Sequence, residues 1–84
     1  MTSSQTNLLA PVLRYLANRE GLGLTLDAIT GGVTDEGHEA HKDDTQAALN
    51  YLASIGHVSV IGSSLLKARY AITPAGTLAH ETNS

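Results

Sequence analysis

Apolar residues recur at helical spacing near the start of the chain. The stripe at positions i, i+3, i+4 and i+7 consists of Leu9, Val12, Leu13 and Leu16. This periodicity predicts a helix over about residues 8–20. Pro11 is expected in its first turn, where the missing N–H costs least, and Gly21 is expected to end it in the left-handed conformation.

A short second helix is predicted after residue 25. Thr25 is a candidate N-cap, and Asp27 in the first turn would interact favourably with the positive end of the helix dipole. The pair Gly31-Gly32 is expected to end this helix after little more than one turn. Val33 would then lie in the following loop as an inward-facing anchor.

The third predicted helix has the broadest apolar face. That face consists of Ala48, Leu49, Tyr51, Leu52 and Ile55. Two starting points stay open for this helix. It begins near Thr45, capped by Asp43 or Asp44, which makes residues 34–43 an acidic loop; or it begins at Asp35 or Gly37, which makes them an acidic first turn.

Alternating polar and apolar residues predict a β-hairpin after the third helix. Its strands cover about residues 57–62 and 67–72, and the connection between them is short enough for a hairpin turn. Thr73-Pro74 is a specific helix start, and the last helix, at about residues 74–81, is expected to fold back onto the first helix through Leu78. The predicted core contains Leu13, Leu16, Leu52, Ile55, Val58 and Ile72.

Together these elements predict one α+β domain. It covers residues 8–81, and flexible tails are expected at residues 1–7 and 82–84, which are mostly polar. The absence of cysteine excludes disulfides and thiolate metal sites. No apolar run approaches the roughly 20 residues that span a bilayer, and the N-terminal residues lack the basic region of a signal peptide. A cytoplasmic protein that does not enter the membrane is therefore expected.

Two segments carry a resemblance to a known superfamily. Residues 48–58, ALNYLASIGHV, are similar to the end of a recognition helix that runs into the first strand of a wing. Residues 70–76, YAITPAG, are similar to a strand exit in small bacterial regulators. Together with the order of elements, the chain resembles the winged helix-turn-helix superfamily over about residues 8–80. The resemblance implies a winged helix with a three-helix core, a two-stranded β-hairpin wing and a short C-terminal helix.

The resemblance implies double-stranded DNA as the partner and transcriptional regulation as the function. The third helix would enter the major groove with Lys42, Gln46 and Asn50, while Lys67 and Arg69 of the wing would hold phosphates. Asn and Gln side chains can read adenine through two hydrogen bonds, although an ordinary solvated helix face would show the same residues. The single-domain size is also compatible with a phage or mobile-element gene.

The net charge of the chain favours DNA binding less than the order of its predicted helices and strands does. The chain has five Lys and Arg residues against eight Asp and Glu residues, a net charge of −3. Phosphate neutralisation supplies most of the affinity of a small DNA-binding domain, so a functional binder is expected to form a homodimer. Arg14 and Arg19 would add to the interface only if the first helix faced the duplex.

The alternative function is a winged-helix protein–protein interaction module that does not bind DNA. Five acids lie just before the third helix and could attract a basic protein surface, including one that normally holds nucleic acid. They are Asp35, Glu36, Glu39, Asp43 and Asp44. Leu65 and Leu66 at the wing tip are expected to be exposed and to add a second contact.

Candidate chemistry is sparse. His38 and His41, at i and i+3, lack the i, i+4 spacing of a zincin, and no metal or other cofactor is expected. No serine lies in a nucleophile elbow, and no glycine-rich loop precedes a helix as a phosphate cradle. So small a chain is also expected to have no room for a substrate pocket of about 300 Å³. An enzyme is therefore not expected.

Overall fold

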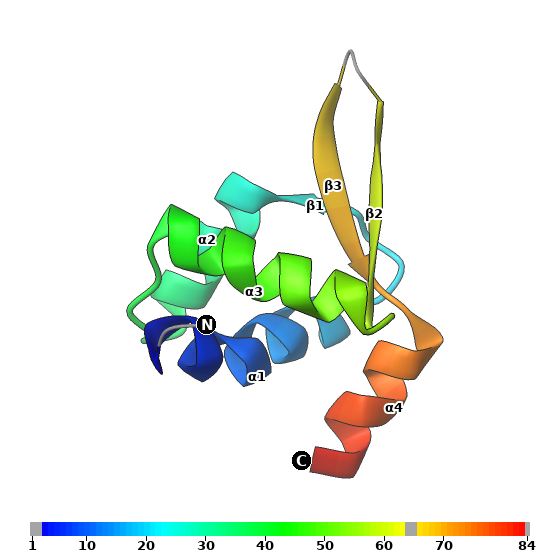
Figure 1. Cartoon of the computed structure of the whole chain (residues 1–84), viewed down its shortest axis with the longest axis horizontal. Coiled ribbons are helices and arrows are strands. Elements are labelled where there is room, and N and C mark those ends of the chain that lie inside the picture. The colour runs from blue at the N-terminus through cyan, green and yellow to red at the C-terminus, as the bar shows by residue number, and fades with distance from the viewer. Residues whose placement is uncertain (1–2, 64–65, 84) are drawn as a thin grey trace.

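The computed structural model describes the backbone of residues 3–63 and 66–83 (Figure 1). This part of the chain forms a small α+β fold with four helices and one three-stranded antiparallel sheet. The helices are α1 (Ser3–Ala17), α2 (Leu26–Asp35), α3 (Lys42–Ser54) and α4 (Pro74–Asn83). The strands are β1 (Leu24–Thr25), β2 (Val58–Ser63) and β3 (Leu66–Ile72). The predicted α+β class is confirmed.

Helix α1 begins and ends earlier than the periodicity predicted. It covers Ser3–Ala17, so residues 3–7 are helical and do not form a tail, and Pro11 lies in the helix interior instead of the first turn. Proline there removes the N–H that would bond to the carbonyl of residue 7. Burial of the apolar stripe offsets this cost, since Val12 and Leu16 are almost wholly shielded from solvent. Gly21 has a φ of +86° in the turn after the helix.

Helix α2 is longer than predicted. Thr25 is its N-cap, as expected, and its hydroxyl oxygen accepts a hydrogen bond of 3.3 Å from the Ala28 N–H. The helix continues through Gly31 and Gly32 to Asp35, so the prediction that this pair ends it was wrong. A Cβ at Gly32 would clash with the ring of Tyr15, which shows that this glycine permits the close approach of α1 and α2. Val33 is therefore a buried helical residue and not a loop anchor.

Helix α3 begins at Lys42, between the two starting points considered. Asp43 and Asp44 lie in its first turn, and His41 occupies the N-cap position without a side-chain capping bond. Its buried face consists of Thr45, Ala48, Leu49 and Leu52. Ile55 follows the helix and is 44% exposed, so its predicted place in the core was wrong.

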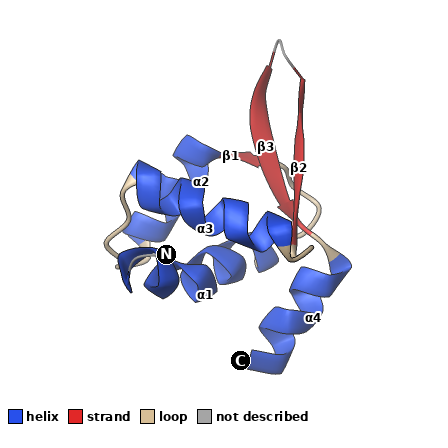
Figure 2. Ribbon diagram, viewed as in Figure 1, coloured by secondary structure: helices blue, strands red, loops and turns tan. Residues whose placement is uncertain are grey.

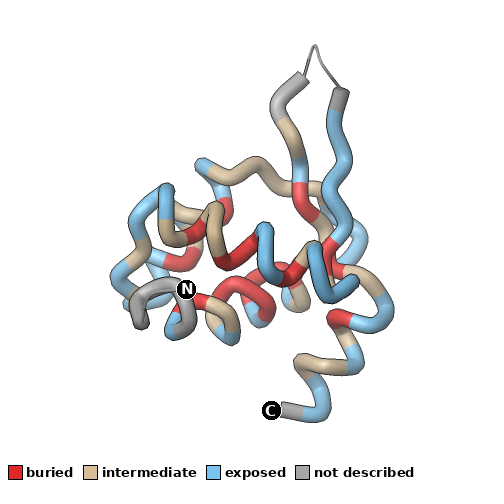
Figure 3. The backbone as a smooth tube through the Cα atoms, in the orientation of Figure 1, coloured by how far each residue is buried: buried red, intermediate tan, exposed pale blue. Residues whose placement is uncertain are grey.

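The sheet has the strand order β1-β3-β2. Strands β2 and β3 form the predicted hairpin, in which Val58 is opposite Ile72 and Val60 is opposite Tyr70. Strand β1, which was not predicted, pairs with the other edge of β3 and places Leu24 opposite Tyr70. Figure 2 shows the hairpin extending beyond the helices. Val58 and Val60 lie on the same face of β2, but only Val58, at the base of the hairpin, is buried. Most of the described part of β2 is exposed (Figure 3).

The core lies between α1, α2, α3 and the base of the sheet. It includes five of the predicted core residues, namely Leu13, Leu16, Leu52, Val58 and Ile72. Helix α4 begins as predicted, because the Thr73 hydroxyl accepts a hydrogen bond of 3.0 Å from the Gly76 N–H and donates one of 2.6 Å to the Gly56 carbonyl. Leu78 is 64% exposed, so α4 does not pack through it as predicted; Ala79 is the α4 residue packed against the core.

Among the described residues, no helix has the length and apolar content that a membrane span requires.

Candidate functional site

The outer face of α3 carries the polar residues that the sequence singled out. With successive residues turned by about 100°, Lys42, Gln46 and Asn50 follow one side of the helix. Lys42 and Asn50 are exposed, and Gln46 is half-buried against the sheet. The buried face of α3 lies beside this side of the helix and packs towards α1. The structure therefore places the three predicted helix residues along one side of α3, with Gln46 next to the sheet.

A hydrogen-bonded network fixes two of these side chains. Gln46 Nε2 donates to Asn50 Oδ1 and to the Tyr70 hydroxyl, each at 2.9 Å. Tyr70 lies on β3 and is 5% exposed. The bond between the two amides uses one donor and one acceptor, so the pair still offers one amide oxygen and one NH₂ group to an outside partner.

Tyr70 was not predicted as a site residue. Tyr70 alternates with Arg69 along the predicted strand, and a buried tyrosine usually finds a partner for its hydroxyl. The need of a buried hydroxyl for a partner was the sequence signal that could have identified Tyr70, but it does not identify Gln46 as that partner.

The cations near this face are partly engaged. Lys42 Nζ lies 3.2 Å from Asp27 Oδ1, with both side chains largely exposed. Arg69 Nη1 donates to the Gly23 carbonyl at 3.3 Å, and Arg69 lies opposite Thr25 and Ile61 in the sheet. Lys67 belongs to β3, two positions before Arg69, and the register of the β2–β3 pair shifts between them.

Three predicted contacts lie wholly or partly outside the described residues. These are Leu65 and the side chains of Leu66 and Lys67.

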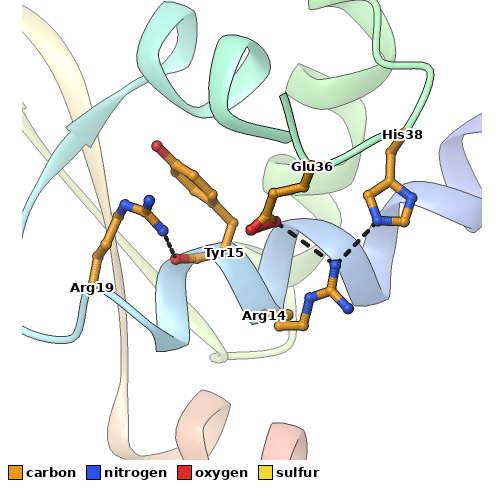
Figure 4. Close-up of polar contacts among 5 residues, drawn as sticks. All are labelled: Arg14, Tyr15, Arg19, Glu36 and His38. Atoms are coloured by element: carbon orange, nitrogen blue, oxygen red, sulfur yellow. Dashed lines mark hydrogen bonds and ion pairs between the residues drawn. The ribbon is translucent and has the colours of Figure 1, made fainter. Parts of the chain in front are cut away.

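The other two arginines do not belong to this surface. Arg14 Nη2 lies 3.2 Å from His38 Nε2, which accepts a hydrogen bond in the tautomer that carries its proton on Nδ1, and 3.7 Å from Glu36 Oε1 (Figure 4). Arg19 stacks 3.7 Å from the centroid of the Tyr15 ring and donates to the Tyr15 carbonyl. Arg14 therefore joins α1 to the segment after α2, and Arg19 contacts the C-terminal part of α1.

The acidic segment gathers at the end of the molecule away from the hairpin (Figure 1). It covers the last residue of α2, the connection to α3 and the first turn of α3. Glu36 is paired with Arg14, and Glu39 Oε1 lies 3.4 Å from His41 Nε2. Asp43 is exposed on the outer face of α3, and Asp44 is half-buried. No group of three or more His, Asp or Glu side chains in the described residues is arranged to hold a metal ion.

The candidate interface thus combines polar residues from one face of α3 with Arg69 and Tyr70 of β3. Comparisons with protein-family models, with curated proteins and with solved structures found no match to this chain. Function is therefore inferred from the arrangement of its own residues.

A second feature lies on another side of α3. An open groove of about 600 Å³ separates α1, the C-terminal half of α3 and α4. Tyr51 and Ile55, each more than 40% exposed, belong to its wall. The sequence led us to expect no enclosed substrate pocket, and this groove is open to solvent, because α4 packs on α1 without covering the end of α3.

Proposed function

We propose that this chain is a small winged-helix DNA-binding protein that regulates transcription. The order α1-β1-α2-α3-β2-β3-α4 and the projecting β2–β3 hairpin are compatible with a winged helix. In that arrangement α3 is the recognition helix and the hairpin is the wing. The observation that carries the proposal is the amide pair on the outer face of α3, held in place by Tyr70 beside the wing.

The amide pair suits adenine. A major groove about 12 Å wide admits a helix, and adenine presents there an N6 donor next to an N7 acceptor. The free amide oxygen and NH₂ of the Gln46–Asn50 pair form the complementary acceptor and donor. Because Tyr70 restrains Gln46 before binding, less side-chain entropy is lost when the base is contacted. Arg69 and Lys67 of β3 would contact the phosphates.

The charge distribution predicts weak binding by one copy. The chain carries a net charge of −3, the Lys42 ammonium is paired with Asp27, and Asp43 shares the outer face of α3. Few phosphates can therefore be neutralised, and affinity for DNA rises with the number of neutralised phosphates, so one copy should bind weakly. Two copies on a two-fold symmetric operator would double the contacts, so we expect the functional form on DNA to be a dimer.

Binding to duplex DNA tests the proposal directly. A labelled mixed-sequence duplex is titrated at low and moderate salt, and the bound sequences are recovered and read. Binding that weakens with salt and enriches adenine-containing sites supports the proposal; no binding at either salt concentration overturns it.

A matched pair of charge variants locates the interface. Arg69→Gln should weaken binding to every duplex and flatten the dependence on salt. Arg14→Gln removes the same charge from α1 and should change binding much less. Equal effects of the two variants would show that only net charge matters and that the wing does not meet phosphate.

The second candidate function is a protein-interaction module, and one observation favours it. The five acids of residues 35–44 lie together at one end of the molecule, with Glu39 and Asp43 exposed. Among the described residues, their neighbouring positive groups are the Arg14 and Lys42 side chains, together with His41 when protonated. A basic protein surface would be attracted to this end, whereas a duplex would be repelled.

A further inference from the structure

The polar residues that line the groove between α1, α3 and α4 are unusual for this chain. Three of its four histidines line the groove, and so does Arg14. None of the lining residues is Asp or Glu, although the chain has more acids than bases. The ionisable groups of this lining are thus a guanidinium, three imidazoles and the Tyr51 phenol, in a protein that is negatively charged overall.

The rest of the groove is apolar. Leu9, Pro11 and Leu13 of α1 form one wall, and Tyr51, Leu52 and Ile55 form the facing one. Its volume of about 600 Å³ lies within the range of about 300–1,000 Å³ that is typical of small-molecule sites. An apolar body the size of one or two aromatic rings would cover side chains such as Ile55 that are now in contact with water.

Arg14 is available to an anion. Its contact with Glu36 is long, at 3.7 Å, and its side chain is 48% exposed, so the ion pair contributes little to stability. Both contacts of Arg14, to Glu36 and to His38, are made by the same nitrogen, Nη2. A planar guanidinium can bind a carboxylate through two parallel hydrogen bonds, which are stronger than those between neutral groups.

We propose that this groove binds a small amphipathic carboxylate, with an aromatic or aliphatic body on the apolar walls and the carboxylate on Arg14. The imidazoles of His38, His57 and His80 line the same groove and supply further N–H donors to the carboxylate. The site is independent of the proposed DNA interface, since Tyr51 and Ile55 follow a different side of α3 from Gln46 and Lys42.

Binding is tested with two probes of equal shape. Isotope-labelled protein is titrated with naphthalene carboxylate and, separately, with the neutral naphthalene carboxamide, and the backbone amide signals are followed by NMR. The carboxylate should shift the signals of Leu13, Tyr51 and His57 and should bind about tenfold or more tightly than the carboxamide, as expected for a charge-assisted hydrogen bond. No saturable shift with either probe, or equal affinity for both, overturns the proposal.

Variants of the groove separate the carboxylate contact from the apolar contact. Arg14→Gln should abolish the preference for the carboxylate, and Arg14→Lys, which keeps the charge, should restore part of it. Ala10→Trp, at an exposed lining position, should fill the groove and block both probes. Ala28→Trp places the same side chain at an exposed position of α2 and should leave binding unchanged.

Two results would overturn the site even if a probe binds. One is binding that survives both Arg14→Gln and Ala10→Trp, because the probe would then lie elsewhere. The other is sedimentation equilibrium showing a dimer that Ala10→Trp dissociates, because a second copy would then be the occupant. Thermal unfolding of each variant establishes that the protein is folded before the binding result is interpreted.

Discussion

Tyrosine is the one large aromatic residue type in this chain, which has three Tyr and no Phe or Trp. The Tyr15 ring fills the space above Gly32 and carries Arg19 on its ring face. Tyr70 joins the sheet to the amide pair of α3, and Tyr51 forms part of the groove wall. Each tyrosine therefore occupies a different functional region: the core, the candidate DNA interface and the candidate ligand groove.

The contact between Tyr15 and Gly32 predicts opposite effects at two neighbouring glycines. Gly32→Ala should destabilise the protein by about 1–3 kcal/mol, because the new methyl group clashes with the ring. Gly31→Ala meets no atom within 4 Å of its Cβ and should stabilise α2 by up to about 1 kcal/mol. Urea unfolding of both variants measures the difference. Stabilisation by both substitutions would contradict the close packing of α1 against α2.

The Tyr70 hydroxyl predicts an effect on sequence preference. Tyr70→Phe keeps the buried ring but releases Gln46, so the preference for the best DNA site over mixed duplex should fall by up to about tenfold. Affinity for mixed duplex should remain the same, because phosphate contacts supply it. Competition titrations of both proteins measure the ratio. An unchanged preference would show that the hydroxyl does not position the amide pair, whereas absence of any DNA binding by wild type would reject the function itself.

At the scale of helices and strands, the features predicted correctly are those set by neighbouring residues. Thr25 and Thr73 cap their helices through hydrogen bonds within three residues, and the hairpin follows from local alternation. The features missed depend on distant partners. Strand β1 has two residues and forms because β3 lies beside it. Gly32 lies inside α2, where the Tyr15 ring occupies the space that a side chain would need.

The same distinction holds for the candidate site. The 3.6-residue period places Lys42, Gln46 and Asn50 on one face without any structure. The bond between Gln46 and Tyr70 joins residues 24 positions apart, for which neither periodicity nor spacing gives a signal. The groove was not predicted for a similar reason, because its lining depends on the position of α4 against α1.

The position of Pro11 predicts that one substitution will strengthen α1. Alanine at this position restores the N–H of a helix interior, so Pro11→Ala should raise the free energy of unfolding by roughly 1–3 kcal/mol. Chemical denaturation measures the change, and backbone chemical shifts show whether residues 3–7 remain helical. Little or no gain would indicate that the helix starts near Pro11, as the sequence alone predicted.

At the scale of the whole molecule, the acidic end and the candidate DNA interface meet on α3. Its first turn belongs to the acidic end, while its middle carries the amide pair and lies beside β3. The two candidate functions would use different parts of this helix. A duplex would approach the amide pair and the hairpin, and a basic protein would approach the first turn and the residues before it. Neutralising the first turn therefore has opposite consequences for the two functions.

The double variant Asp43→Asn, Asp44→Asn should tighten DNA binding if the protein is a regulator. Both acids lie in the first turn of α3, so in a regulator that reads DNA with this helix their removal would relieve repulsion of phosphate, most strongly at low salt. If the protein is an interaction module, the same variant should slow association with a basic partner. Duplex titration and a pull-down from host lysate, performed with wild type and variant, give the two readouts.

A control with the same charge change separates a local effect from a general one. Asp35→Asn with Glu39→Gln also removes two charges from the acidic segment, but from positions outside α3. A regulator should gain less affinity for DNA from this control than from the Asp43, Asp44 variant, because the screened interaction weakens with distance from the duplex. An interaction module should lose its partner with either variant and bind DNA with neither. Equal gains in DNA affinity from both variants would mean that net charge, and not the placement of α3 on the duplex, governs binding.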